Sequence, residues 1–200
     1  MKVLVLRTTT KEGKSHDSRA NGFTYPDKGF VKAPDWDGKP SCGGGLHGLL
    51  WGHGDFSIPA DDVLFKLIEV DDSPDNLVEF DGKCKFREGE VVFTGTQEDI
   101  IKAIKSHPNY PKDNILNFDI QITTDNNKIM QSGNESTQTA GKGSTQTAGN
   151  ESTQTAGVNS IQIGYWYDDD INYRVVSRKV TKTMADKPYK FEKGKWTLVK

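Results

Sequence analysis

The sequence predicts an α/β or mainly-β N-terminal domain, a short β-solenoid of octad repeats and β-rich C-terminal strands. Three observations lead to this fold class: a tandem eight-residue repeat, short alternating apolar runs on both sides of it, and a single strong helix signal. We expect three parts: an N-terminal domain over 1–117, the repeat solenoid over 118–165, and C-terminal strands over 166–200.

The N-terminal part is rich in strand candidates. Apolar runs with little interruption and alternating runs are both typical of strands in a sheet. The dipeptide Asp81-Gly82 separates two of these runs and favours a tight hairpin turn. Strands are expected at 2–7, 63–70, 77–80, 83–86 and 90–93.

One helix is expected after the last of these strands. Thr96 and Asp99 have the spacing of a capping box, and an apolar stripe follows over 100–104. Pro108 cannot continue a helix, so the helix should end before it.

The repeat covers residues 134–157, which read NESTQTAG, KGSTQTAG and NESTQTAG without a gap. Weaker octads extend the register to 126–165. Thr-Gln-Thr suits a strand, and the Ala-Gly corners suit turns. We expect consecutive octads to stack, with Thr over Thr, Gln over Gln, and the outer Ile and Met residues joining the stack to an apolar core. The alternative is a flexible linker, because such a polar tract can also remain unstructured.

The C-terminal part should form two hairpins. One is expected to join 161–167 with 171–180, and the other to join 189–191 with 196–199. Both would add strands next to the repeat.

Composition excludes several functional classes. The chain has 26 Lys+Arg against 28 Asp+Glu, a net charge of -2, so it lacks the basic excess of a dedicated nucleic-acid binder. No apolar run reaches the length of a membrane-spanning helix. Cys42 and Cys84 provide neither a disulfide framework nor a four-cysteine zinc site. We therefore expect a cytoplasmic protein with no metal, no cofactor and no membrane partner.

A glycine-rich segment contains the strongest candidates for a ligand-binding site. Glycine allows close approach of the backbone to a ligand, and backbone N–H groups in such a turn can hold an anion. The alternative is a tight structural turn packed beside tryptophan. The candidate ligand-binding residues are Gly43, Gly44, Gly45, His47 and Trp51.

The octads resemble the repeats of bacterial ice-nucleation proteins, which share the Ser-Thr-Gln-Thr-Ala-Gly string. The resemblance implies a β-solenoid with a repeat face of Thr-x-Thr rows that order water. It also implies a structural or self-associating role for an array this short. The repeat-face residues are Thr137, Thr139, Thr145, Thr147, Thr153 and Thr155.

Two further resemblances concern the first half of the chain. The strings APDWD at 33–37 and CGGGLHGLLWG at 42–52 are similar to an uncharacterised domain of phage and prophage proteins. This implies a phage origin, a location in the host cell and no known activity.

A fainter resemblance is to mono-ADP-ribosyltransferases, which use an Arg or His on a strand and a Glu-x-Glu motif. It makes Arg7, His47, Glu88 and Glu90 the candidate catalytic residues. The alternative is that these glutamates are solvated carboxylates beside basic neighbours.

The function expected from the sequence is therefore that of a phage-type, non-enzymatic binding and assembly protein. It would form homo-oligomers through the solenoid and could hold a host protein or a small anionic nucleotide. The alternatives are a mono-ADP-ribosyltransferase-like enzyme and an ice- or water-ordering repeat protein.

Overall fold

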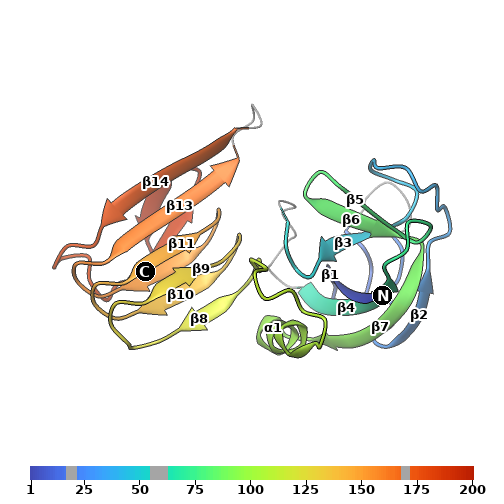
Figure 1. Cartoon of the computed structure of the whole chain (residues 1–200), viewed down its shortest axis with the longest axis horizontal. Helices are drawn as coiled ribbons and strands as arrows, with labels where there is room; N and C mark the ends of the chain where they lie inside the picture. Colours follow the sequence, from blue (N-terminus) through green and yellow to red (C-terminus); the bar gives the residue numbers. More distant parts are fainter. Residues whose placement is uncertain (17–21, 55–62, 168–171) are drawn as a thin grey trace. The chain divides into compact units, whose positions relative to one another are not determined.

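The computed structural model describes residues 1–16, 22–54, 63–167 and 172–200, and of Tyr167 the backbone only. The chain is mainly β and forms two compact units, Met1–Asn114 and Ile115–Lys200 (Figure 1). The strands of 166–200, expected as a separate part, lie in the same unit as the repeats and belong to the same sheets.

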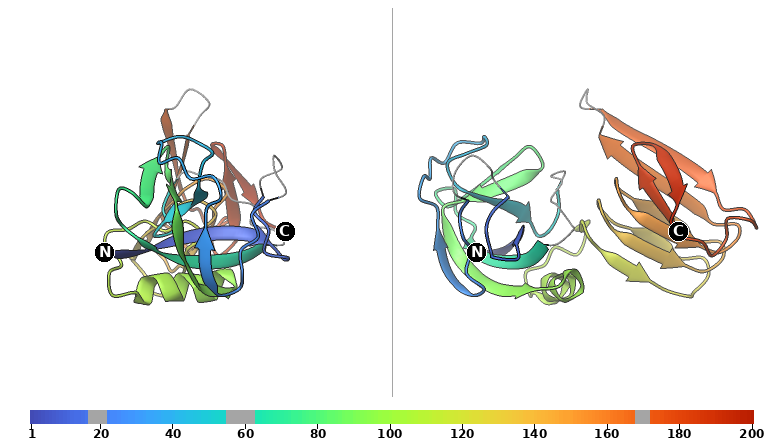
Figure 2. Two further views of the ribbon diagram at one scale, coloured as in Figure 1. Left: turned by 90° about the vertical axis from the view of Figure 1, so that its right-hand side faces the viewer. Right: turned by 180° about the vertical axis from the view of Figure 1, so that it is seen from behind.

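Unit 1 is built on a curved, antiparallel sheet of seven strands in the order β2-β7-β4-β1-β3-β6-β5 (Figures 1 and 2). Its centre is the pair β1–β4, which are the longest strands and contribute many of the buried aliphatic side chains. The strands are β1 (Lys2–Thr10), β2 (Gly29–Lys32), β3 (Leu46–Leu50), β4 (Val63–Asp71), β5 (Leu77–Phe80), β6 (Lys83–Phe86) and β7 (Glu88–Gly95).

The helix α1 (Gln97–Ser106) packs against β4 and β7. It begins as expected, because the Thr96 hydroxyl accepts a hydrogen bond from the Asp99 backbone N–H at 3.3 Å. The expected hairpin turn is also confirmed, since Asp81 and Gly82 both have positive φ. Strands β2 and β3 were not predicted, because their sequences are short and rich in glycine or polar residues.

Unit 2 is a two-sheet solenoid whose repeat strands, from β8 to β13, alternate between the sheets as the chain proceeds. One sheet has the order β16-β15-β12-β10-β8 and the other β14-β13-β11-β9 (Figure 1). The repeat strands are β8 (Ile120–Ile122), β9 (Ile129–Gln131), β10 (Thr137–Ala140), β11 (Thr145–Ala148), β12 (Thr153–Ala156) and β13 (Ile161–Tyr167). The C-terminal strands are β14 (Tyr173–Lys179), β15 (Tyr189–Glu192) and β16 (Lys195–Leu198).

Each turn of the solenoid takes two octads, which corrects the expectation that consecutive octads stack. Thr137 pairs in parallel with Thr153, and Thr145 with Ile161, so partners are sixteen residues apart. Neighbouring octads instead lie on opposite sheets. Every eighth residue, at the corner before each strand, has positive φ: Asn127, Glu135, Gly143, Glu151 and Asn159.

Candidate functional site

Arg7 and His47 lie close together in unit 1. Arg7 is near the end of β1, and its Nη1 donates a hydrogen bond to the carbonyl oxygen of His47 on β3 at 3.3 Å. The sequence could not show this proximity, because it depends on the antiparallel pairing of β1 with β3.

Glu88 and Glu90 do not lie beside Arg7 and His47. Residue Leu4 of β1 aligns with Glu69 of β4, and Glu69 aligns with Glu90 of β7. Alternation along a strand then places Arg7 and Glu90 on opposite faces of the sheet. The four candidate catalytic residues therefore share no cleft, and the transferase arrangement is not formed.

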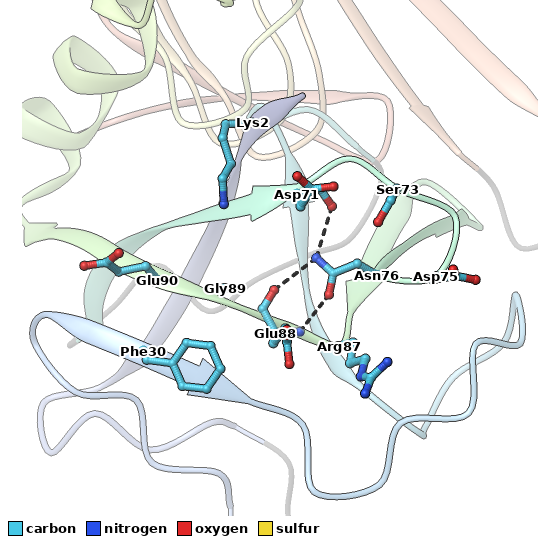
Figure 3. A pocket seen from close by; sticks show the side chains of 10 residues that line it. All are labelled: Lys2, Phe30, Asp71, Ser73, Asp75, Asn76, Arg87, Glu88, Gly89 and Glu90. Atoms are coloured by element: carbon cyan, nitrogen blue, oxygen red, sulfur yellow. Dashed lines mark hydrogen bonds between the residues drawn. The ribbon is translucent and has the colours of Figure 1, made fainter.

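The two glutamates instead line a pocket of about 340 Å³ on the outer surface (Figure 3). Asn76 is the buried residue at its base; its Nδ2 donates to the carbonyl oxygens of Asp71 and Glu88, and its Oδ1 accepts from the Glu88 N–H. Glu88 also forms an exposed ion pair with Lys32 at 3.4 Å. The lining residues are Lys2, Phe30, Asp71, Ser73, Asp75, Asn76, Arg87, Glu88, Gly89 and Glu90.

The glycine-rich turn is held by a buried lysine. Lys85 is fully buried, and its ammonium donates to Asp37 Oδ1 at 2.5 Å and to the carbonyl oxygen of Gly43 at 2.9 Å. Hydrogen bonding to Lys85 lowers the pKa of the Asp37 carboxyl.

This turn lacks the features of an anion cradle. Gly43 directs its carbonyl oxygen, not its N–H, at the charged group, and a Cβ on Gly44 would lie 2.4 Å from the Asp37 carboxyl carbon. Gly44 and Gly45 leave room for the side chains of Asp37 and Trp36, whereas Gly43 has open space around it and a positive φ. Trp51 lies elsewhere in the unit, against His107 and Tyr110.

His47 is half-buried and neutral. Burial, with smaller contributions from Arg7, Lys83 and Lys85, lowers its pKa. Its Nε2 is buried without a hydrogen-bond partner in the described part of the chain. The thiol nearest to it in sequence, Cys42, accepts a hydrogen bond from Lys83 at 3.0 Å. Among the described residues, no three His, Cys, Asp or Glu side chains form a group that could hold a metal ion.

The interior of unit 2 is lined by glutamine, serine and alanine, and threonine faces out. In one sheet Gln154 Nε2 donates to Gln138 Oε1 at 2.9 Å, and in the other Gln162 Nε2 donates to Gln146 Oε1 at 3.1 Å. The amides also cross the interior, since Gln138 Nε2 donates to the Thr147 carbonyl oxygen at 3.0 Å. A polar interior is stable here because its donors are used both along the stack and across it.

At the corners, serine and asparagine side chains also form hydrogen bonds between successive turns of the solenoid. The Ser152 hydroxyl accepts from the Ser136 N–H at 3.0 Å, and Ser160 does the same for Ser144 at 3.1 Å. At the neighbouring position, Asn134 Oδ1 accepts from the Asn150 N–H at 2.9 Å. These contacts join residues sixteen apart and fix the register of the turns.

The repeat-face threonines are divided between two surfaces. Thr137, Thr139, Thr153 and Thr155 form a two-by-two array on one sheet, and the pair Thr145 and Thr147 lies on the other. The single face expected from the sequence is therefore wrong, because alternate octads change sheets.

The outer isoleucines also occupy outward positions. Ile122 is 70% exposed and Ile129 is 87% exposed. Ile129, in an outer octad, was expected to join an apolar core, but pairing aligns it with Thr145, whose side chain points outward. Met130, at a glutamine position, is buried as expected.

The two ends of the solenoid differ. At the C-terminal end β15 pairs antiparallel with β12, and β14 with β13. Phe191 is buried there in the space that a Cβ on Gly164 would need, which explains glycine at an alanine position of the octad. At the other end, no strand among the described residues pairs with the outer edges of β8 and β9.

The chain is similar to ice nucleation proteins over about half of its length. It is 32% identical over 109 residues, 53% of this chain, to the ice nucleation protein InaU of Pantoea ananas and to an ice nucleation protein of Enterobacter agglomerans. The match spans only 10% and 8% of those proteins. No protein family profile and no solved structure matches the chain. No helix in the described ranges is long and apolar enough to cross a membrane. The findings thus establish a mainly-β chain that is similar to ice nucleation proteins.

Proposed function

We propose that the chain is a non-enzymatic binding and assembly protein that associates with a second copy of itself through the open end of its solenoid. The observation that carries this proposal is the difference between the two ends. At the C-terminal end the edge strands are β14 and β16, which belong to antiparallel hairpins, whereas at the other end the edge strands are the parallel repeat strands β8 and β9. Unpaired backbone N–H and C=O groups at a sheet edge are a template for pairing with another chain.

The geometry favours a closed dimer over a filament. A filament needs head-to-tail contacts, which require two complementary ends. Here the C-terminal end presents antiparallel hairpin strands, which do not continue the parallel pairing of β8 and β9, so two copies would meet through β8 and β9 about a twofold axis. Ile122 and Ile129, both exposed beside the open edges, would then be partly buried between copies.

The test is light scattering across a concentration series with matched double variants. Ile122→Lys with Ile129→Lys places charge at the open end and should give a monomer without loss of secondary structure. Val175→Lys with Leu198→Lys changes two exposed apolar residues of β14 and β16 and should leave the dimer intact. A native chain that is monomeric at every concentration would contradict the proposal.

A second candidate function, ordering of water, is favoured by the threonine array together with the similarity to ice nucleation proteins. Its test is the freezing temperature of droplets that contain the protein. Thr139→Lys with Thr155→Lys should abolish any rise in that temperature, and native protein without such a rise would exclude this function.

The phage origin and the capture of a host protein remain predictions from the sequence resemblance.

A further inference from the structure

Two buried cations lie side by side in the sheet of unit 1. Arg7 of β1 and Lys66 of β4 are cross-strand partners, so their Cα atoms are about 5 Å apart. Arg7 is 8% exposed and Lys66 is fully buried. Like charges at directly opposed positions destabilise a sheet unless other groups compensate them.

Lys66 is compensated within the chain. Its ammonium donates to the carbonyl oxygen of Pro26 at 3.0 Å, to Asp27 Oδ1 at 3.0 Å and to the Thr94 hydroxyl at 3.1 Å. All three donors of the lysine are therefore used, one of them by a carboxylate.

Arg7 has much less. The structure gives it one hydrogen bond, from Nη1 to the His47 carbonyl oxygen at 3.3 Å. Its Nε is buried, and among the described residues no group accepts from it. No ion pair of the described residues includes Arg7. A buried guanidinium without a negative partner is strongly unfavourable, because desolvation is not repaid by attraction.

The titratable groups around Arg7 do not supply that negative charge. Tyr25 is buried and its pKa is raised to about 12, chiefly by burial, so its phenol stays neutral. Burial also raises the pKa of the Cys84 thiol. His16 is an exposed residue. Its partial burial together with the charge of Arg7 lowers its pKa.

We propose that Arg7 is the centre of a binding site for the anionic group, a phosphate or a carboxylate, of a small molecule. A tetrahedral or planar anion would accept from the free Nε–H and a neighbouring Nη–H, the fork geometry for which arginine is suited. This site goes beyond self-association, because it lies in the other unit and needs no second copy.

The experiment is a titration of the full chain with sodium phosphate, and separately with sodium acetate, followed by nuclear magnetic resonance. The Arg7 side-chain Nε–H and the amides of Tyr25 and His16 report on the site. We expect saturable shifts of these signals by at least one of the two anions, and the more effective anion identifies the chemistry. Sodium chloride at matched ionic strength should not reproduce them.

Variants separate binding from folding. Arg7→Met should weaken anion binding at least tenfold, and Arg87→Gln, which removes one positive charge elsewhere, should leave it unchanged. In anion-free buffer Arg7→Met should raise the thermal midpoint of unit 1, because it removes an uncompensated buried charge. Absence of saturable shifts with both anions, equal shifts with chloride, or a lower midpoint for Arg7→Met would overturn the proposal.

Discussion

Arg178 donates two hydrogen bonds to one oxygen of Gln162, from Nε at 2.9 Å and from Nη2 at 2.7 Å. Its guanidinium lies 4.1 Å from the ring centroid of Tyr189 and 4.2 Å from that of Trp196. Burial lowers its pKa to about 10, so it remains charged at neutral pH. Gln146 and Gln162 are stacked and hydrogen-bonded inside one sheet, and Arg178 lies next in this row. Arg178 thus supplies the donors for Gln162 Oε1, the last acceptor of the row.

Arg178→Ala should destabilise unit 2 by roughly 2–4 kcal/mol, because it removes the cation–π contacts and leaves Gln162 Oε1 without a donor. Urea unfolding followed by tryptophan fluorescence measures this. Lys179→Ala, an exposed neighbour on the same strand, should change stability by less than about 0.5 kcal/mol. Equal effects of the two variants would show that Arg178 has no special role at this end.

Gln146→Leu should destabilise unit 2 by roughly 1–3 kcal/mol although leucine is apolar and similar in size. The reason is that Gln162 Nε2 and the Thr155 carbonyl oxygen, which Gln146 pairs at 3.1 Å and 2.9 Å, would both lose a partner. Thr147→Ala, on the outer face of the same strand, is the matched control and should be nearly neutral. A stabilised Gln146→Leu would mean that the interior does not depend on its amides.

Gly149→Ala should be unfavourable by roughly 1–3 kcal/mol, because added atoms in a packed corner force it to shift. A Cβ at Gly149 would lie 2.1 Å from Asn134 Oδ1, the atom that accepts from Asn150. Glu151→Gly, two residues on, should be neutral or stabilising by up to about 1 kcal/mol, since it relieves a left-handed side-chain residue. Glu151 has φ 61° and only a long, exposed ion pair to Lys190. Thermal unfolding of both variants compares the two corner positions, and the reverse order of stability would contradict this corner geometry.

Unit 1 should lose stability as the pH falls below about 6.5, the ordinary pKa of histidine. The folded chain holds the pKa of His47 lower than this, so the unfolded chain binds the proton first. The stabilising contribution is complete above pH 6.5 and is lost as the pH falls through the folded-state pKa. His47→Gln should flatten the dependence of the urea midpoint on pH between about 7.5 and 5, measured from exchange of β1 amides.

His16 contributes a slope of the same sign, so some pH dependence should remain in that variant. An unchanged slope in His47→Gln would contradict the buried, neutral environment of this side chain.

Local patterns in the sequence identified most elements of the fold. Capping at Thr96, the turn at Asp81-Gly82 and the strands around the repeat depend on residues close in sequence, and all are present. The solenoid followed from the octad period. Its two-octad turn did not, because a period of eight is compatible with one or two strands per turn. Only the pairing of strands sixteen residues apart decides between them, and no local pattern specifies that pairing.

Side-chain placement in unit 1 was much less predictable. Lys66 and Lys85 are charged residues of the kind usually found on the surface, yet both are fully buried by loops distant in sequence. Glycines around Gly43 were candidates for holding an anion, with a structural turn as the alternative, and Gly43 directs its carbonyl oxygen at Lys85. The separation of Arg7 from Glu90 depends on strand order, which no local pattern specifies.

The most direct test of which repeat strands pair is the detection of scalar couplings across hydrogen bonds. These couplings are measured by nuclear magnetic resonance between amide nitrogens and carbonyl carbons. The Thr153 N–H donates to the Ser136 carbonyl at 2.8 Å and the Thr145 N–H to the Lys128 carbonyl at 2.7 Å, each one turn earlier. Couplings for these two pairs should therefore be detected. Correlations linking adjacent octads instead, or amides of the repeat that exchange with solvent within seconds, would contradict a coil of sixteen residues closed around glutamine.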